Sequence, residues 1–177
     1  MIKKIVCFDF DGTLIHTPSP DAGKPEWEKQ TGLSWGGRGW WGNPESLNLN
    51  VFQPPVNQWV YKHFLEEAKN PDAYVFLATG RLAKLEQQVL DVLELNDIKI
   101  RNNADEVGLD GVFCNTGGET FKFKCWLFEK IIKANPQATE FTMYDDRHEH
   151  LKDFIHWAKQ QPIKVNIIDV VNKKQIF

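Results

Sequence analysis

Ile5-Val6-Cys7-Phe8-Asp9-Phe10-Asp11-Gly12-Thr13-Leu14 is the stretch of sequence that decides the fold. Its apolar first half predicts a short buried strand, and the glycine after the second aspartate predicts a turn. Because side chains at positions i and i+2 of a strand point to the same face, Asp9 and Asp11 are expected to converge where this strand ends. Two neighbouring carboxylates repel each other unless a cation or a proton intervenes. The stretch therefore predicts a functional site.

Length and composition favour one globular domain spanning residues 1–177. The 177 residues are 42% hydrophobic and 25% charged, and a chain of this length can bury a substantial core. The net charge of −3 does not favour non-specific binding to polyanions. The three cysteines show no metal-ligand spacing and favour a reduced, cytoplasmic protein. We expect no signal peptide, no membrane span and no obligate protein partner.

Residues 17–56 interrupt the regular pattern directly after the first strand. Prolines and glycines punctuate this segment, and Trp35, Trp40 and Trp41 lie among them. The composition of residues 36–44 excludes a helix interior or a central strand. Irregular connections of this length are commonly functional. The segment is therefore expected to be a lid or cap inserted within the domain.

The rest of the chain alternates between helical periodicity and short apolar runs. Apolar residues at helical spacing predict helices, and continuous apolar runs predict strands that are covered on both faces. This alternation predicts a doubly wound, three-layer α/β/α parallel sheet. The predicted helices begin near Val56, Leu82, Trp126 and Leu151, and the later strands cover residues 73–78, 109–114, 140–144 and 164–170.

Polar residues follow three of the predicted strands directly. Asp9 and Asp11 follow the first, Thr79 the second, and Asp145 with Asp146 the fourth along the chain. In open α/β sheets the binding crevice lies outside the carboxyl ends of the strands. Three separate segments are therefore expected to bring carboxylates and a hydroxyl to one edge of the sheet.

These residues resemble the four signatures of the haloacid dehalogenase (HAD) superfamily, in the family's order. Residues 9–14, Asp-Phe-Asp-Gly-Thr-Leu, resemble the first signature, and Thr79 resembles the second. Lys122 or Lys124 resembles the third, and Lys124 is preferred because a Thr-x-x-Phe-Lys pattern precedes an amphipathic helix. Asp145-Asp146 resembles the acidic fourth signature. The resemblance implies a HAD-like Rossmannoid fold and, since an aspartate stands at the second position of the first signature, a phosphatase or phosphomutase.

The residue types permit hydrolysis in two steps. Asp9 would attack phosphorus and form an aspartyl-phosphate. Asp11 would protonate the leaving oxygen and then deprotonate the water that hydrolyses the intermediate. An all-oxygen ligand set favours Mg²⁺. The resemblance implies that the Asp9 carboxylate, the Asp11 backbone carbonyl and Asp145 hold this ion, with Asp146 as a further candidate.

The same resemblance implies roles for residues that contact the phosphorylated substrate. Thr79 would donate a hydrogen bond to a phosphoryl oxygen, and the lysine would balance the charge of the nucleophile and the phosphate. Arg81, Arg147 and His150 have two open interpretations: phosphate binding, or an ion pair or helix-face position in the structure. The candidates for substrate binding are Gly12, Thr13, Gly80, Arg38, Trp41 and Arg147.

A narrower resemblance concerns the Trp-rich segment and the fourth signature. Gly39-Trp40-Trp41-x-x-Pro44 and residues 144–150, Tyr-Asp-Asp-Arg-x-x-His, are similar to the HAD domain of the Swiss Army Knife RNA-repair family. This similarity implies a phosphatase that acts on a nucleic-acid or nucleotide terminal phosphate, such as an RNA or DNA end. Trp40 and Trp41 would either pack the segment onto the core or stack on nucleobases, with Arg38 touching phosphate.

Two other functions are open at this point. The first is hydrolysis of a small metabolite such as a sugar phosphate or a nucleotide. The second is a catalytically weak module that uses the aspartates only to hold phosphate, although such a module would not need Asp11 or the lysine.

Overall fold

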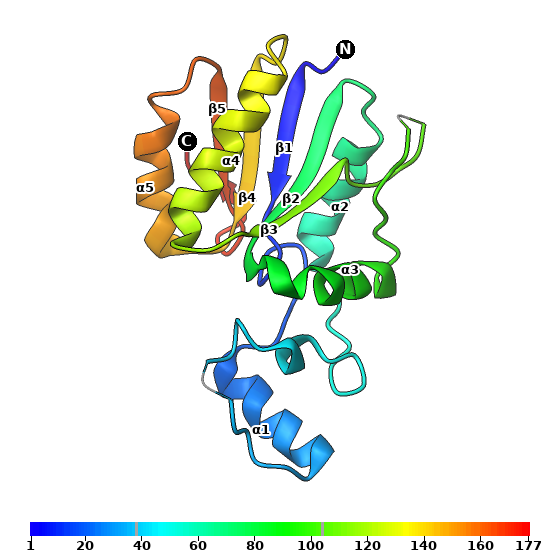
Figure 1. Ribbon diagram of the computed structural model, residues 1–177. Coiled ribbons are helices and arrows are strands. Elements are labelled where there is room, and N and C mark those ends of the chain that lie inside the picture. The colour runs from blue at the N-terminus through cyan, green and yellow to red at the C-terminus, as the bar shows by residue number, and fades with distance from the viewer. Residues whose placement is uncertain (38, 104) are drawn as a thin grey trace.

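A six-stranded sheet in the order β3-β2-β1-β4-β5-β6 forms the centre of the computed structural model, which describes residues 1–37, 39–103 and 105–177 (Figure 1). The first five strands are parallel, and the short β6 at the edge runs antiparallel to β5. The predicted doubly wound sheet is confirmed, whereas β6 was not predicted. The strands are β1 Lys4–Phe8, β2 Ala73–Leu82, β3 Gly111–Asn115, β4 Glu140–Asp145, β5 Lys164–Asp169 and β6 Lys174–Gln175.

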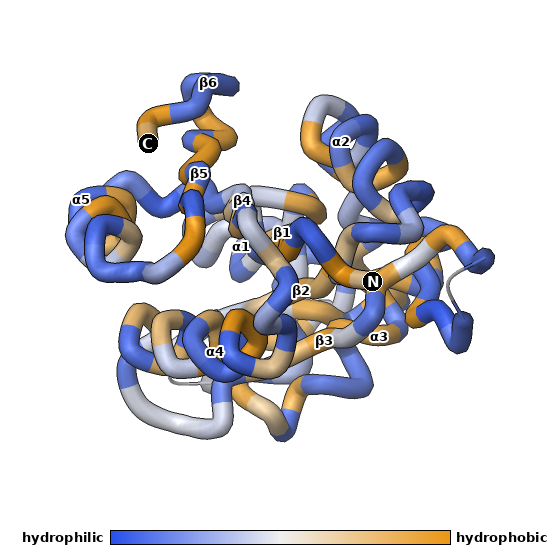
Figure 2. Tube along the Cα trace, turned by 90° about the horizontal axis from the view of Figure 1, so that it is seen from above, coloured by the Kyte–Doolittle hydropathy of each residue, from blue (hydrophilic) through white to orange (hydrophobic). Residues whose placement is uncertain are grey.

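Helices cover both faces of the sheet. Helices α2 and α3 share a buried cluster with one face, and α4 and α5 share a second cluster with the other. Figure 2 shows α2 and α4 on opposite sides of the strands. The three predicted layers are therefore present. The helices are α1 Pro20–Thr31, α2 Gln58–Ala68, α3 Glu86–Leu95, α4 Thr120–Ala134 and α5 His148–Ala158, with 3₁₀ turns at Pro44–Leu47 and Ala83–Leu85.

Strand β1 lies at the point where the strand order reverses. The chain adds β2 and β3 on one side of β1, and then returns to add β4 and β5 on the other. Residues 5–8 of β1 are buried because both faces of the sheet are covered. Ligands bind open α/β sheets at such a switch point, beyond the carboxyl ends of the strands. Asp9, the residue that follows β1, stands at this point.

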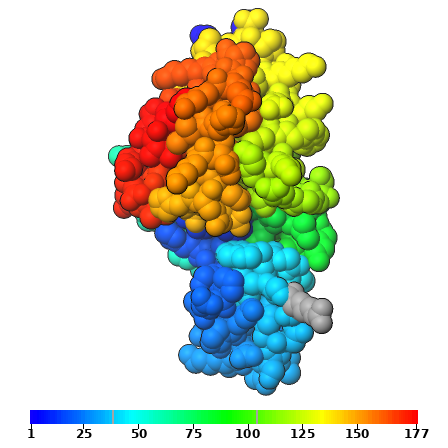
Figure 3. Space-filling view, turned by 90° about the vertical axis from the view of Figure 1, so that its left-hand side faces the viewer, coloured from blue at the N-terminus to red at the C-terminus, as the bar shows by residue number. Residues whose placement is uncertain are grey.

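Residues 17–56 are hereafter called the insert, and its described residues, 17–37 and 39–56, lie beyond the carboxyl edge of the sheet, past the arrowhead of β1 (Figure 1). In the space-filling view they form a lower lobe, coloured blue to cyan (Figure 3). The insert has its own small core of Trp27, Trp40 and Phe52. Trp40 is 2% exposed, and its Nε1 donates to the carbonyl oxygen of Pro18 at 2.9 Å. Trp40 therefore packs within the insert itself, and not onto the core of the sheet as the packing interpretation expected.

Helix α1 was not predicted, because the sequence shows only an irregular segment there. Pro25 and Gly23 both lie inside α1, and both residues disfavour helices. Tertiary packing compensates, since Trp27 is buried in the small core of the insert. A Cβ at Gly23 would lie 2.2 Å from the ring of Trp40, so only glycine allows this close approach.

Strand β2 is longer than the sequence predicts. We expected it to end at Ala78, but it continues through Thr79-Gly80-Arg81 to Leu82. Pairing with β3 carries it on, with a register shift between Thr79 and Leu82. Such irregularities bend a strand and re-aim its side chains, and they are common beside functional sites.

Helix α4 begins earlier than predicted. It starts at Thr120 rather than near Trp126, so Lys122 and Lys124 lie inside the helix, whereas the sequence predicted that they lie before it. Residues two apart on a helix point in different directions, about 200° around the axis. Trp126, expected to line the apolar side of this helix, is 54% exposed.

A largely buried ion pair connects the end of α2, the start of β2 and the residue before β3. Arg101 donates to both carboxylate oxygens of Asp110, at 2.7 Å each. It also donates to the carbonyl oxygens of Ala68, at the end of α2, and Ala73, at the start of β2. Asp110 in turn accepts from the backbone amide of Val75 at 2.6 Å. This pair ties the end of a helix to two strands.

Arg101→Ala should lower the free energy of unfolding by about 3–5 kcal/mol, because it leaves a partly buried carboxylate without its partner. Urea denaturation measures this change. Lys3→Ala is the matched control, since Lys3 pairs with Asp72 at 3.0 Å in an exposed position, where water screens the pair and its contribution to stability is small. Equal effects of the two substitutions would contradict a stabilising role for the Arg101 pair.

Candidate active site

A buried lysine joins two of the predicted aspartates. The Nζ atom of Lys124, in α4, lies 2.7 Å from Asp9 Oδ1 and 2.7 Å from Asp145 Oδ2. All three residues are buried: Asp9 is 6% exposed, Lys124 1% and Asp145 0%. Lys122 instead pairs with Glu119 at the surface. The structure thus brings Lys124, and not Lys122, to the carboxylates.

Burial and neighbouring charges perturb the ionisation of this group. Burial raises the pKa of Asp9 to about 7; the ammonium of Lys124 opposes the rise, and Asp145 and Asp146 add to it. Burial alone would lower the pKa of Lys124, but Asp145 and Asp9 outweigh burial and raise it. Lys124 is therefore protonated at neutral pH and supplies a fixed positive charge beside Asp9.

Three carboxylates form an acidic triad. Asp9, Asp145 and Asp146 offer oxygen atoms that all lie within 4.8 Å of one another. Burial raises the pKa of Asp146, and the charge of Asp145 raises it further. One ammonium does not balance three carboxylates, so the triad has room for another cation. Oxygen ligands of this kind are the ones that Mg²⁺ prefers.

The turn after β1 is shaped around Asp146. Gly12 has a φ of 71°, and a Cβ there would lie 2.3 Å from Asp146 Oδ2, so the turn requires glycine. The Thr13 hydroxyl lies 3.4 Å from Asp146 Oδ1, as donor. The backbone amide of Arg147 donates to Asp145 Oδ1 at 2.9 Å. These contacts hold the acidic side chains in position.

The Asp11 carboxylate is turned away from the triad. It accepts hydrogen bonds from the guanidinium of Arg81 and, at 2.7 Å, from the hydroxyl of Thr17. Metal binding was expected only of its backbone carbonyl, and that assignment stays a prediction. Asp11 and Asp9 therefore have different surroundings, as a separate acid/base and nucleophile require.

Thr79 and Gly80 lie at the irregular end of β2. Thr79 is fully buried, and its Oγ1 accepts from the backbone amide of Arg81 at 3.0 Å. A hydroxyl group that accepts one bond can still donate its own hydrogen. A Cβ at Gly80 would lie 2.8 Å from Thr120 Oγ1, so glycine lets β2 approach the start of α4.

Two adjacent cavities open at this edge of the sheet. Asp11, Trp41 and Arg147 line both. The first cavity has a volume of about 240 Å³ and is also lined by Asp9, Gly80, Arg81, Thr120 and Lys124. The second has a volume of about 280 Å³ and is also lined by Gly12, Thr17, Ser19 and Asp146.

Most of the predicted substrate-binding residues meet here. Gly12, Gly80, Trp41 and Arg147 line the cavities, whereas Thr13 is buried beneath them against Asp146. Trp41 is 40% exposed, so its ring is accessible from the cavities. Arg38, the remaining candidate, lies outside the described residues.

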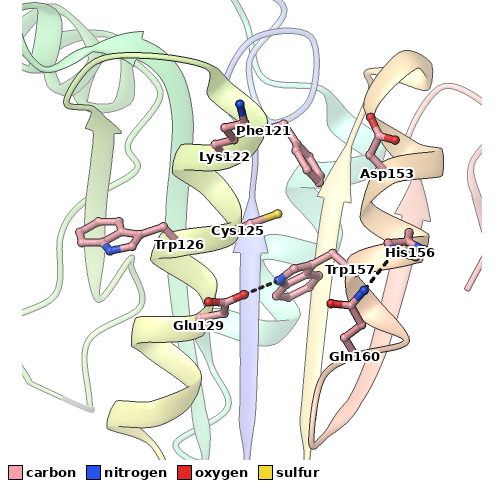
Figure 4. A pocket seen from close by; sticks show the side chains of 9 residues that line it. All are labelled: Phe121, Lys122, Cys125, Trp126, Glu129, Asp153, His156, Trp157 and Gln160. Atoms are coloured by element: carbon pink, nitrogen blue, oxygen red, sulfur yellow. Dashed lines mark hydrogen bonds between the residues drawn. The ribbon is translucent and has the colours of Figure 1, made fainter.

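A larger groove lies elsewhere, between α4 and α5 (Figure 4). Its volume is about 460 Å³, but its polar groups largely satisfy one another: Trp157 Nε1 donates to Glu129 at 3.1 Å, and Gln160 contacts the His156 ring at 2.9 Å. Among the described residues, no group of three or more carboxylates converges on it, so it lacks the chemistry of the first cavity. The lining residues are Phe121, Lys122, Cys125, Trp126, Glu129, Asp153, His156, Trp157 and Gln160.

The structure decides one open interpretation and adds two residues to the site. Arg81 pairs with Asp11, in agreement with the ion-pair interpretation of this arginine, although the sequence did not identify its partner. Sequence analysis assigned no role to Thr17 and Thr120, which line the cavities. Thr120 stands in the Thr-x-x-Phe-Lys pattern, but its contacts, like those of Thr17, depend on segments distant in the sequence. His150 contacts the rings of Phe121 and Phe154 and lines neither cavity.

The fold and the site together define the class. A doubly wound sheet whose first strand delivers two aspartates, with a buried lysine and an acidic pair from later elements, is the arrangement of the HAD-like proteins. Residues 27–176 match the family described as HAD domain family 1 in Swiss Army Knife RNA repair proteins. The chain belongs to this family. The match begins after Asp9 and Asp11, so these two residues are assigned by sequence pattern and by position in the structure.

The chain is similar to two solved structures, the first of which shares the fold. An archaeal β-phosphoglucomutase from Pyrococcus sp. strain ST 04 has 18% sequence identity and a TM-score of 0.50, over 92% of this chain and 85% of that chain. The HAD domain of the effector protein Lem4 from Legionella pneumophila has 15% identity and a TM-score of 0.47, over 96% and 87%. Within the described part of the chain, no helix is long and apolar enough to cross a membrane.

Proposed function

We propose that this protein is a Mg²⁺-dependent phosphatase that hydrolyses a phosphomonoester through an aspartyl-phosphate on Asp9. The observation that carries the proposal is the buried Asp9–Lys124–Asp145 group at the switch point of the sheet. The lysine orients Asp9 and offsets its charge, and the cavity beside it leaves room for a phosphoryl group. In this proposal the insert acts as a cap over the site.

The proposed reaction has two steps. A carboxylate oxygen of Asp9 forms a bond to phosphorus while the bond from phosphorus to the leaving oxygen breaks, and Asp11 gives its proton to that oxygen. Asp11 then takes a proton from water, whose oxygen attacks phosphorus and releases inorganic phosphate and free Asp9. Thr79 and Lys124 donate hydrogen bonds to the phosphoryl oxygens during both steps.

The acidic triad fits a magnesium ion. Asp9, Asp145 and Asp146 would hold it, together with the backbone carbonyl of Asp11 that the family resemblance implies. When bound, the ion neutralises the carboxylates and the phosphate and so lets an anion approach an anionic site.

The proposed substrate is a terminal phosphate of a nucleic acid or a nucleotide. The support is the family to which the chain belongs and the exposed ring of Trp41 at the cavities, because bases stack on accessible aromatic rings. The volume of the first cavity, about 240 Å³, also suits a small sugar phosphate, which is the second candidate.

A phosphate-release screen tests the function and its metal dependence together. The panel holds 3′- and 5′-phosphorylated oligonucleotides, mononucleotides and sugar phosphates, each with Mg²⁺ or with EDTA. We expect release with Mg²⁺ and loss of at least about 10²-fold with EDTA, because the carboxylates then repel the phosphate. Preference for oligonucleotides supports a nucleic-acid end, and preference for sugar phosphates supports the second candidate. Metal-independent release, or no release from any substrate, would contradict the proposal, and the latter would favour a phosphate-binding module.

A further inference from the structure

The buried guanidinium of Arg81 connects Asp11 to the insert. Arg81 is 1% exposed. Its Nε donates to Asp11 Oδ1 at 3.1 Å and Oδ2 at 3.0 Å, and its Nη2 donates to Oδ1 at 2.8 Å. Its Nη1 donates to the carbonyl oxygen of Trp41 at 3.0 Å and to Ser46 Oγ at 2.6 Å. One planar group therefore contacts the candidate acid/base and two residues of the insert.

The insert is built closely around this guanidinium. The ring of Trp41 lies 4.9 Å from it, at cation–π distance. Ser46 is fully buried, and its hydroxyl donates in turn to the carbonyl oxygen of Asn43 at 2.7 Å. The donors of an arginine are held in one rigid plane and the charge is permanent. A displacement of the insert would therefore move or unpair the edge of Arg81 that holds Asp11.

The hydrogen bonds also distinguish the two oxygens of Asp11. Among the residues that the structure describes, Oδ1 accepts from Arg81 Nε, Arg81 Nη2 and Thr17 Oγ1, whereas Oδ2 accepts only from Arg81 Nε. Oδ2 is thus the oxygen left for proton exchange with a leaving group or water. Thr17 belongs to the insert as well, so both residues that hold Asp11 depend on the position of the insert.

We propose that Arg81 is a positioning residue, which holds Asp11 in its reactive orientation only while the insert is docked. The proposal rests on the phosphatase function proposed above. Asp11 must place one oxygen against the leaving oxygen and later against water, and a displacement of about 1 Å can lower a rate about 10²-fold. The guanidinium itself does not touch the phosphate in this role. Because it binds both the insert and Asp11, the orientation of Asp11 depends on where the insert lies.

A series of substrates with different leaving groups tests this role. Arg81→Lys keeps the charge but cannot form the planar fork. We expect its kcat/KM to fall about 10²-fold for alkyl phosphates and about 10-fold or less for p-nitrophenyl phosphate, whose leaving group departs without a proton. Ser46→Ala should also lower kcat/KM more for alkyl phosphates than for p-nitrophenyl phosphate, but by a smaller factor. An equal fall for all leaving groups would overturn the proposal, because it would indicate a role in phosphate binding or folding.

Two further variants separate positioning from general damage. Arg101→Lys removes the fork from the other buried Arg–Asp pair, far from the cavities, and should leave the ratio between alkyl and aryl substrates unchanged. The double variant Arg81→Lys/Asp11→Asn should be no slower than Asp11→Asn alone, because Arg81 acts through Asp11. If the rate losses of Arg81→Lys and Asp11→Asn multiplied in the double variant, the proposal would be overturned.

Amide hydrogen exchange tests the link between Asp11, Arg81 and the insert without an activity measurement. The Ser46 amide donates to Asn43 at 3.1 Å and the Asn48 amide to Glu45 at 3.3 Å, so both report on the order of the insert. Asp11→Ala and Arg81→Lys should each increase exchange at these amides, and Arg101→Lys should not. If the unaltered protein releases no phosphate from any substrate, the proposed function fails, and the exchange data still decide the coupling. Unchanged exchange in Asp11→Ala and Arg81→Lys would overturn the proposed role of Arg81.

Discussion

Asp9→Asn should abolish phosphate release from aryl phosphates while the protein remains folded. An amide oxygen is a poor nucleophile, so the first step loses its attacking group. Removal of a nucleophile from such a site lowers kcat by on the order of 10⁴-fold or more. Asparagine has nearly the same shape as aspartate. The substitution also removes one of three neighbouring carboxylates, so the repulsion within the triad falls and the fold is retained.

Steady-state hydrolysis of p-nitrophenyl phosphate, with circular dichroism to check the fold, measures this effect. Asp21→Asn is the control, since Asp21 is an exposed residue of the insert and should retain full activity. An Asp9→Asn protein with more than about a hundredth of the original rate would exclude an aspartyl-phosphate on Asp9, because nucleophile losses are far larger.

Lys124→Ala should remove activity and also destabilise the protein. The substitution leaves Asp9 and Asp145 buried next to each other without the ammonium that lies 2.7 Å from each. Breaking a buried ion pair by removing one partner costs about 3–5 kcal/mol. The phosphoryl group would also lose a positive charge, so we expect kcat to fall by about 10²–10³-fold even at temperatures where the variant is folded.

Urea denaturation and kinetics well below the melting temperature separate the two effects. Lys122→Ala is the matched control: Lys122 lies two residues away in the same helix, but its exposed pair with Glu119 should contribute about 1 kcal/mol or less. Loss of activity in Lys122→Ala, together with a functional Lys124→Ala, would reverse the assignment of the lysine.

Sequence patterns were sufficient for the presence of the five parallel strands and for the polar residues that follow them. The apolar runs predicted the parallel strands because strands covered on both faces need apolar side chains throughout. Asp9, Thr79 and Asp145 come together because the carboxyl ends of parallel strands meet at one edge. This convergence follows from topology alone, without knowledge of side-chain contacts.

Other elements depended on contacts between distant segments. Helix α1 forms despite Pro25 because Trp27 is buried by residues of the same insert, and local propensity cannot indicate such packing. Strand β2 passes Ala78 because β3 continues to pair with it. The early start of α4 sets the helical phase that turns Lys124 inward and Lys122 outward.

The sequence by itself determined the fold class and the identities of the nucleophile and acid/base candidates, Asp9 and Asp11. These conclusions rest on local hydrophobic patterns and on the spacing of two carboxylates along one strand. The sequence favoured Lys124 but left Lys122 open, and only the tertiary structure decided between them and connected Asp11 to the insert through Arg81. The physical reason is that a buried charge is defined by its partners, and here those partners lie 70 residues or more away in the chain for both Arg81–Asp11 and Lys124–Asp9.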